Sequence, residues 1–241
     1  MIDQKETIFT GGSGLLGGRI QKRLPEASYP SHKEFDVRDY AGMERYISSR
    51  KFTLFVHAAA LTSPPVVKEA PLEALKTNIS GTANVVALCM QRGIKLVYIS
   101  TDYVFRGDKG GYKEEDPVYP VNKYAWSKLG GECAVRLYDN SLIIRTSFGP
   151  DRFPFEKAFI DQWTSREGAG AIAEKIVKLI KINPKGTFHI GGPRRTVYEY
   201  AKSLSPEKAI GKLSIDDAAF NAPRDTSLDC GKSDKLFKEN S

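Results

Sequence analysis

A glycine-rich stretch near the start of the chain sets the strongest limit on the fold. It follows a β-branched and aromatic run over residues 6–10 and precedes a helical pattern over 15–24. The glycines fit two spacings, Gly12-x-Gly14-x-x-Gly17 and Gly11-x-x-Gly14-x-x-Gly17. Either spacing permits a tight turn and lets backbone N–H groups approach a pyrophosphate at a helix N-terminus. We expect a dinucleotide at this turn; a glycine loop without a ligand is the alternative.

Buried strands alternate with helices over the first 150 residues. Strands are expected at 53–57, 94–99 and 141–146, a weakly marked one at 27–29, and helices at 39–50, 71–92 and 120–138. Later elements are expected at 167–182 (helix), 187–190 (strand) and 196–204 (helix). This alternation is typical of an α/β protein with a doubly wound parallel sheet. We expect a Rossmann-type domain over 1–150 and a small substrate-binding lobe over 151–241.

Two of these strands deliver chemically informative residues to their carboxyl ends, where open α/β sheets bind ligands. Ala58, Ala59 and Ala60 follow one strand, and their small side chains leave room for a flat ligand. Ser100, Thr101 and Asp102 follow the next. His57 ends an apolar run, so we interpret it as a core histidine rather than a catalyst.

Tyr124 and Lys128 are four residues apart in the helix expected over 120–138, so they project from one face. An ammonium beside a phenol favours the phenolate and should lower the pKa of Tyr124, as proton transfer requires. The spacing alone is common by chance. It becomes informative beside the glycine turn and Ser100-Thr101-Asp102.

Composition narrows the class of protein. No apolar run approaches the length of a membrane span, and the N-terminus lacks a secretory signal. Three scattered cysteines favour reduced thiols in a cytoplasmic protein over disulfides or a zinc site, and no metal is expected. The net charge of +7 comes from dispersed residues, which favours small anionic ligands over nucleic acid, with solvated surface charge as the alternative.

Further stretches complete a recognisable pattern. They are Ile99-Ser100-Thr101-Asp102-Tyr103-Val104-Phe105, Tyr124 to Glu132, Arg145-Thr146-Ser147, Asp161-Gln162, Phe188-His189-Ile190-Gly191-Gly192 and Arg224-Asp225-Thr226-Ser227-Leu228-Asp229. Together with the glycine turn, they resemble the extended short-chain dehydrogenase/reductase family, and within it the dTDP-4-dehydrorhamnose reductase branch. The resemblance touches nearly the whole chain.

The resemblance implies a nicotinamide-dependent reduction of a nucleotide-diphosphate 4-keto-6-deoxy sugar. Tyr124 would be the proton donor, Lys128 would hold the nicotinamide ribose, and Thr101 would bind the carbonyl oxygen. The residues expected around the cofactor are Gly11, Ser13, Gly14, Leu15, Leu16, Gly17, Asp36, Val37, Ala58, Ala59, Ala60, Asn78, Ser100, Tyr124 and Lys128. Those expected around the substrate are Asp102, Tyr103, Phe148 and Arg224.

The cofactor preference depends on the region after residue 30. Asp36 lies near the position of a ribose-binding acid but past Pro30, where it could instead meet the adenine. Basic side chains nearby could hold a 2′-phosphate: Arg19, His32, Lys33 and Arg38. We therefore expect NADP(H), with NAD(H) as the alternative.

The second half departs from the branch. The segment between Pro150 and Asp161 is short, and residues 163–167 do not reproduce the Gly-Ser-Pro-Thr run of the family. Two alternatives to the reductase therefore stay open: a nucleotide-sugar epimerase/reductase, and a cofactor-binding regulatory subunit resembling the methionine adenosyltransferase β subunit. Whether the chain forms a homodimer is also open.

Overall fold

A five-stranded parallel sheet organises the computed structural model, which describes residues 2–218 and 221–240. Its strands are β1 (Thr7–Thr10), β2 (Leu54–His57), β3 (Lys95–Ile99), β4 (Ser141–Thr146) and β9 (Gly186–Ile190), in the order β1-β2-β3-β4-β9. The first four are buried along their whole length, as expected for parallel strands covered on both faces. The predicted α/β fold with a Rossmann-type sheet is confirmed.

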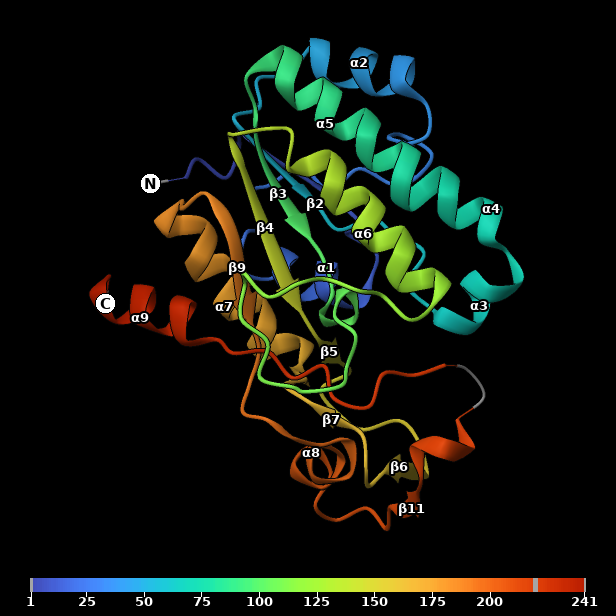
Figure 1. The fold of residues 1–241 in the computed structure, drawn as a ribbon. Helices are drawn as coiled ribbons and strands as arrows, with labels where there is room; N and C mark the ends of the chain where they lie inside the picture. Colours follow the sequence, from blue (N-terminus) through green and yellow to red (C-terminus); the bar gives the residue numbers. More distant parts are fainter. Residues whose placement is uncertain (1, 219–220, 241) are drawn as a thin grey trace.

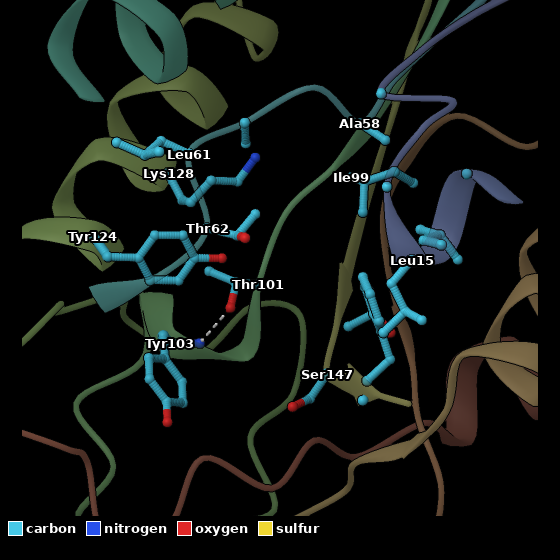
Figure 2. A pocket seen from close by; sticks show the side chains of 18 of the residues that line it. Leu15, Ala58, Leu61, Thr62, Ile99, Thr101, Tyr103, Tyr124, Lys128 and Ser147 are labelled. Atoms are coloured by element: carbon cyan, nitrogen blue, oxygen red, sulfur yellow. Dashed lines mark hydrogen bonds between the residues drawn. The ribbon is translucent and has the colours of Figure 1, made fainter. Parts of the chain in front are cut away.

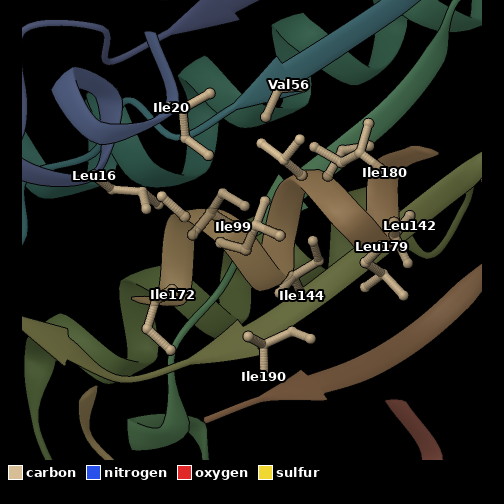
Figure 3. Close-up of a cluster of buried hydrophobic side chains, with 14 of the residues drawn as sticks. Leu16, Ile20, Val56, Ile99, Leu142, Ile144, Ile172, Leu179, Ile180 and Ile190 are labelled. Atoms are coloured by element: carbon tan, nitrogen blue, oxygen red, sulfur yellow. The ribbon is translucent and has the colours of Figure 1, made fainter. Parts of the chain in front are cut away.

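Helices cover both faces of the sheet (Figure 1). On one face, α1 (Leu15–Gln21) and α7 (Ala169–Ile182) pack on Val56, Ile144 and their neighbours (Figure 3). On the other face lie α2 (Tyr40–Ser48), α5 (Gly81–Arg92) and α6 (Lys123–Val135). The C-terminal helix α9 (Gly231–Glu239), which we did not predict, packs against β9 and α7. Each helix thus buries one apolar face against the strands.

The strand predicted at 27–29 is almost absent. Ser28 forms a single parallel bridge with Ile8, through a Ser28 N–H bond to the Thr7 carbonyl at 2.8 Å and a Phe9 N–H bond to the Ser28 carbonyl at 2.9 Å. Pro30 follows two residues later and has no N–H to donate. The sheet edge beside β1 therefore ends in a bridge rather than a full strand.

The helix predicted over 71–92 is confirmed as one uninterrupted helical run, with a π-helical stretch inside it and a separate short helix before it. The structure has α3 (Pro64–Glu69), α4 (Pro71–Ala74), a π-helical turn η1 (Leu75–Ser80) and then α5. A π-turn inserts an extra residue into the helical repeat and is frequently found at functional sites. Asn78 lies in this turn. Residues 64–80 therefore follow a bent path beside α6.

The second lobe lies beyond the carboxyl ends of the strands (Figure 1). It contains α8 (Val197–Leu204), which begins with a capping box between Thr196 and Glu199, and three small ribbons. The ribbons pair β5 (Phe148–Gly149) with β8 (Glu167–Gly168), β10 (Arg195–Thr196) with β7 (Trp163–Thr164), and β11 (Gly211–Leu213) with β6 (Lys157–Phe159). Three elements after residue 150 return to the main sheet or its covering layer: α7, β9 and α9.

Candidate active site

One large cavity lies between the carboxyl ends of the strands and the second lobe. Its volume is about 1090 Å³, the upper end of the ~300–1,000 Å³ typical of ligand pockets. Most predicted site residues line it: Gly11, Ser13, Gly14, Leu15, Leu16, Gly17, Val37, Ala58, Ala59, Ala60, Ser100, Thr101, Asp102, Tyr103, Tyr124, Lys128 and Phe148. Asp36, Asn78 and Arg224 do not line it.

The glycine turn between β1 and α1 forms one wall. Gly11 adopts φ +84, and a Cβ there would lie 2.8 Å from the backbone nitrogen of Ala59. A Cβ on Gly17 would collide with the carbonyl oxygens of Gly11 and Gly12. Only glycine therefore lets the turn pack against the Ala58–Ala60 loop and against its own helix.

The catalytic candidates meet on the opposite wall. Figure 2 shows the Tyr124 phenol and the Lys128 side chain extending from one face of α6 into the cavity, with Thr101 near the phenol. Thr101 precedes the short helix η2 (Asp102–Val104), where its hydroxyl accepts the Tyr103 N–H at 3.2 Å. Asp102 is buried, and its carboxylate accepts hydrogen bonds from Thr226 at 2.6 Å and Thr101 at 3.2 Å.

The sequence predicted a lowered pKa for Tyr124, and this prediction is wrong. Burial raises the pKa of the phenol above its usual value, and interaction with the Thr101 hydroxyl opposes the shift only in part. Lys128 is also buried, which lowers the pKa of its ammonium to about 7 against the attraction of Glu132. Near neutral pH, Tyr124 therefore stays protonated and Lys128 is about half protonated, because the desolvation of each group exceeds the stabilisation that its neighbours give to the charged form.

Lys128 and the strand end behind it are held by packing and hydrogen bonds. The Lys128 ammonium lies 4.2 Å from the centre of the Tyr98 ring. Ser100 donates to the buried Glu132 carboxylate at 2.9 Å, and Glu132 also pairs with the buried guanidinium of Arg145. Ser100 lines the cavity and simultaneously ties β3 to α6.

Asn78 is a buried structural residue rather than a wall of the cavity. Its amide donates to the Leu61 carbonyl at 2.9 Å and accepts the Leu61 N–H at 2.8 Å. The same amide nitrogen donates to the Ser127 hydroxyl at 2.8 Å. The loop after Ala60 is therefore held against α6 through Asn78.

The four basic residues considered for a 2′-phosphate lie in different surroundings. His32 lines the cavity, whereas Lys33 does not. Arg19 pairs with Asp151 at 2.6 Å, and Arg38 pairs with Asp36 at 2.8 Å. Asp36 is thereby engaged by an arginine, which holds the pKa of its carboxyl below its usual value.

His57 is a core histidine, as interpreted from the sequence. Its ring lies between the hydroxyls of Thr10, at 2.8 Å from Nδ1, and Thr82, at 3.1 Å from Nε2. Burial, together with the nearby Lys128 charge, lowers its pKa to about 3. It therefore stays neutral and does not reach the cavity, whose lining excludes it.

The second lobe supplies residues that the sequence did not single out. Lys157, Gln162 and Arg166 line the cavity, as does Ser147 at the end of β4, which belongs to the quoted stretch Arg145-Thr146-Ser147. Gln162 belongs to the quoted pair Asp161-Gln162, so its position could have been inferred from the resemblance. Arg166 lies in the stretch that departs from the family. Arg224 instead pairs with Asp161 at 3.4 Å and Asp216 at 2.7 Å, away from the lining.

The residues present fit a dinucleotide. The glycine turn leaves space where a Cβ would obstruct the backbone, and α1 begins without a side-chain cap or an acidic residue in its first turn. The buried hydroxyl of Thr146 lines the cavity and has no hydrogen-bond partner within the described part of the chain.

In the residues that the structure describes, no group of three metal-ligating side chains was found, and no helix combines the length and apolarity of a bilayer span.

The family model of the RmlD substrate binding domain matches residues 5–238. The chain belongs to this family. The match confirms the resemblance to the dTDP-4-dehydrorhamnose reductase branch of the extended short-chain dehydrogenases/reductases.

Known proteins resemble this member of the RmlD family over nearly its whole length. The structure of a hypothetical dTDP-4-dehydrorhamnose reductase from Sulfolobus tokodaii has a TM-score of 0.86 and 29% identity, covering 96% of this chain and 94% of that one. The Bacillus anthracis dTDP-4-dehydrorhamnose reductase, solved in complex with NADP, has a TM-score of 0.85 and 25% identity, covering 98% and 99%. Methionine adenosyltransferase 2 subunit beta of Pongo abelii is 26% identical, covering 98% of this chain and 83% of that protein.

Proposed function

We propose that this protein is an NADP(H)-dependent reductase of a nucleotide-diphosphate 4-keto-6-deoxy sugar, with NAD(H) as an alternative cofactor. The observation that supports it best is the meeting of Thr101, Tyr124 and Lys128 in a cavity that also contains the glycine turn. A similar reductase from Bacillus anthracis was solved with NADP. The cofactor would lie along Gly11–Gly17 and Ala58–Ala60, and the sugar between Thr101, Tyr124 and the second lobe.

Each catalytic residue has a distinct role in this proposal. The bound nicotinamide supplies a hydride to the carbonyl carbon. Tyr124 gives its hydroxyl proton to the carbonyl oxygen. The Thr101 hydroxyl, which donates to Asp102 in this structure, would turn to donate its proton to the same oxygen as negative charge develops there. A raised pKa keeps Tyr124 protonated and ready to donate. Lys128, with a pKa of about 7, can return a proton to the phenolate.

The test is NADPH oxidation with dTDP-4-keto-6-deoxy-L-mannose, followed by the loss of NADPH absorbance and repeated with NADH. Turnover that disappears in Tyr124→Phe supports the reductase and its role in rhamnose-type biosynthesis. Turnover at the wild-type rate in Tyr124→Phe contradicts the proton-donor role. The ratio of the NADPH and NADH rates gives the cofactor preference.

A regulatory subunit that binds NADP without catalysis is the second candidate. The observation in its favour is the likeness to methionine adenosyltransferase 2 subunit beta over 98% of this chain. A pure binder has no need of Tyr124 as a proton donor, which is why we rank it second. Tight NADPH binding without turnover on any nucleotide-linked keto sugar would favour this candidate.

A homodimer and a cytoplasmic location complete the proposal. Leu72, Leu75 and Trp126 are 58%, 48% and 50% exposed on the adjoining elements α4, η1 and α6, and such an apolar face suits a second copy of the chain. Light scattering would test this by comparing the molar mass of wild type with that of Trp126→Glu.

The cytoplasmic location is supported by the cysteines. All three are free thiols, as expected in a reducing compartment.

A further inference from the structure

Arg166 places a positive charge at the wall of the cavity. It lies between β7 and β8, is half-buried and lines the cavity. Among the residues that the structure describes, no carboxylate forms an ion pair with its guanidinium. Its neighbour Arg195, in contrast, pairs with Glu167 at 3.0 Å. The Asp102 carboxylate interacts with this charge without forming an ion-pair contact, so the guanidinium can still bind a ligand that brings a closer negative charge.

The position of Arg166 is built into the lobe. Its backbone N–H donates to the Thr164 hydroxyl at 3.0 Å, and its carbonyl accepts from Arg195 at 3.1 Å. Its side chain passes Gly149, where a Cβ would lie 3.7 Å from the Arg166 Cδ. The guanidinium Nε points to the Ser147 hydroxyl at 3.4 Å. The side chain is therefore directed along the cavity wall toward the end of β4.

The groups around this guanidinium leave it available. The Tyr103 hydroxyl interacts with both Gln162 and Arg166, so these three side chains form one polar cluster on the wall. The carboxylate of Asp102, the acid in this part of the site, is already engaged by the hydroxyls of Thr226 and Thr101. The cluster thus offers hydrogen-bond donors and one positive charge to an incoming ligand.

We propose that Arg166, supported by Tyr103 and Gln162, binds the diphosphate of the nucleotide-linked sugar. This inference rests on the proposed reductase function. In a 4-keto hexose, the carbonyl carbon and the carbon that bears the diphosphate lie on opposite sides of one six-membered ring. With the carbonyl at Tyr124, the diphosphate lies one sugar ring away. A guanidinium binds two phosphate oxygens at once, which fixes the sugar's orientation.

The proposed contact is a feature of this chain's own sequence. Arg166 falls in residues 163–167, which replace the Gly-Ser-Pro-Thr run expected for the family. It also provides a way to anchor the substrate in a shortened lobe, because one bidentate ion pair can replace several weaker contacts.

The experiment compares Arg166→Gln and Arg166→Lys with wild type and with Arg152→Gln. Arg152 is an exposed arginine of the same lobe that does not line the cavity, so it controls for a general loss of positive charge. Calorimetry gives the Kd of dTDP, and steady-state kinetics give KM and kcat for the nucleotide sugar. The Kd of NADPH reports whether the rest of the site is intact.

Arg166→Gln should weaken dTDP binding and raise KM by about 10- to 100-fold, the range for a lost hydrogen bond to a charged group. The kcat and the NADPH Kd should change less than about threefold. The dTDP affinity of Arg166→Lys should lie between those of wild type and Arg166→Gln, because lysine keeps the positive charge but cannot bind two phosphate oxygens at once in the way a guanidinium does. Arg152→Gln should match wild type.

Unchanged dTDP affinity in Arg166→Gln would overturn the inference, as would wild-type protein that does not bind dTDP. If Arg166→Gln loses NADPH affinity through misfolding, Arg166→Lys decides: wild-type dTDP affinity in that variant overturns the bidentate contact. The dTDP titration needs no turnover. Arg166-dependent dTDP binding without any keto-sugar reduction would support the diphosphate site and reject the reductase.

Discussion

The amide of Asn78 donates to the Ser127 hydroxyl at 2.8 Å and thereby joins the π-helical turn η1 to the helix that bears Tyr124 and Lys128. Ser127 lies between these two residues in sequence, and its hydroxyl donates to the Tyr124 carbonyl at 2.7 Å. The bent path of residues 64–80 brings Asn78 to this position. A local irregularity in one helix is thus coupled to the placement of the catalytic side chains on another.

We predict that Asn78→Ala destabilises the protein and lowers turnover together. It leaves the Leu61 N–H and carbonyl without their partner, which costs about 1–3 kcal/mol of unfolding free energy. Urea unfolding and kcat would measure the two effects. Asn240→Ala, at the exposed residue that follows the end of α9, should stay within about 0.5 kcal/mol. Full stability with lost activity would instead point to direct ligand contact by Asn78.

Tyr124→Phe should lower kcat by about 10²- to 10⁴-fold, because it removes the proposed proton donor and keeps the ring. The ring packs edge-on against Tyr103 at 6.4 Å, so the fold and NADPH affinity should be retained. Turnover and fluorescence titration of NADPH would measure both. The control is Tyr119→Phe, at a tyrosine that is 58% exposed and outside the cavity. A large loss of NADPH affinity in Tyr124→Phe would show that the hydroxyl binds cofactor.

The hydrogen bonds of His57 also predict a loss of stability in acid. The Thr82 hydroxyl donates its single proton to the Asn78 carbonyl at 2.7 Å, so it accepts from His57 Nε2, and Nδ1 accepts from Thr10. The folded protein therefore holds this histidine neutral.

The pKa of His57 is about 3 when folded and near 6.5 when unfolded. Between these values the unfolded chain binds the extra proton, so stability falls as the pH falls through this window. From pH 7 to pH 5 the loss should be about 1–2 kcal/mol from His57, with a further contribution of the same sign from His189, whose pKa is lowered to about 4. Urea unfolding at the two pH values, compared with His57→Gln and with exposed His32→Gln, measures it. An equal pH gradient in wild type and His57→Gln would contradict the assignment.

Much of the fold could be predicted because buried parallel strands are short apolar runs in the sequence. Residues 53–57, 94–99 and 141–146 were recognised in this way and form β2, β3 and β4. The strand at 27–29 was overestimated, since Pro30 limits pairing beyond one bridge. The helix over 71–92 was predicted as continuous and is so, but the π-helical stretch inside it was not foreseen because such a stretch has no simple sequence signal.

The site was only partly predictable for a different reason. Local spacing placed Tyr124 and Lys128 on one helical face, but their pKa values depend on burial by distant segments. Arg166 reaches the cavity only because the second lobe folds back over the sheet edge, a relationship between segments far apart in sequence. Asn78 was expected beside the cofactor, whereas its contacts are with the loop and α6.

Lys128 should reduce stability at neutral pH while supporting activity. Its pKa is about 7 in the folded protein and near 10.5 when unfolded, so between these values the unfolded chain binds the extra proton. Stability should therefore rise with pH from about 7 upward, by about 2 kcal/mol between pH 7 and pH 9. Lys95, with a pKa of about 8, adds to this rise in wild type.

Lys128→Met keeps the aliphatic bulk and removes the buried charge. It should gain about 1–4 kcal/mol at pH 7, more than the ~0.5–2 kcal/mol lost with the ammonium–Tyr98 contact, and it should flatten the pH gradient. It should also lose turnover and weaken NADPH binding, because a residue kept at the expense of stability is retained for function. Thermal unfolding at pH 7 and 9, with exposed Lys22→Met as the control, measures the gradient. A variant less stable than wild type at pH 7, with an unchanged gradient, would mean that the Lys128 ammonium is solvated or fully compensated in the folded protein.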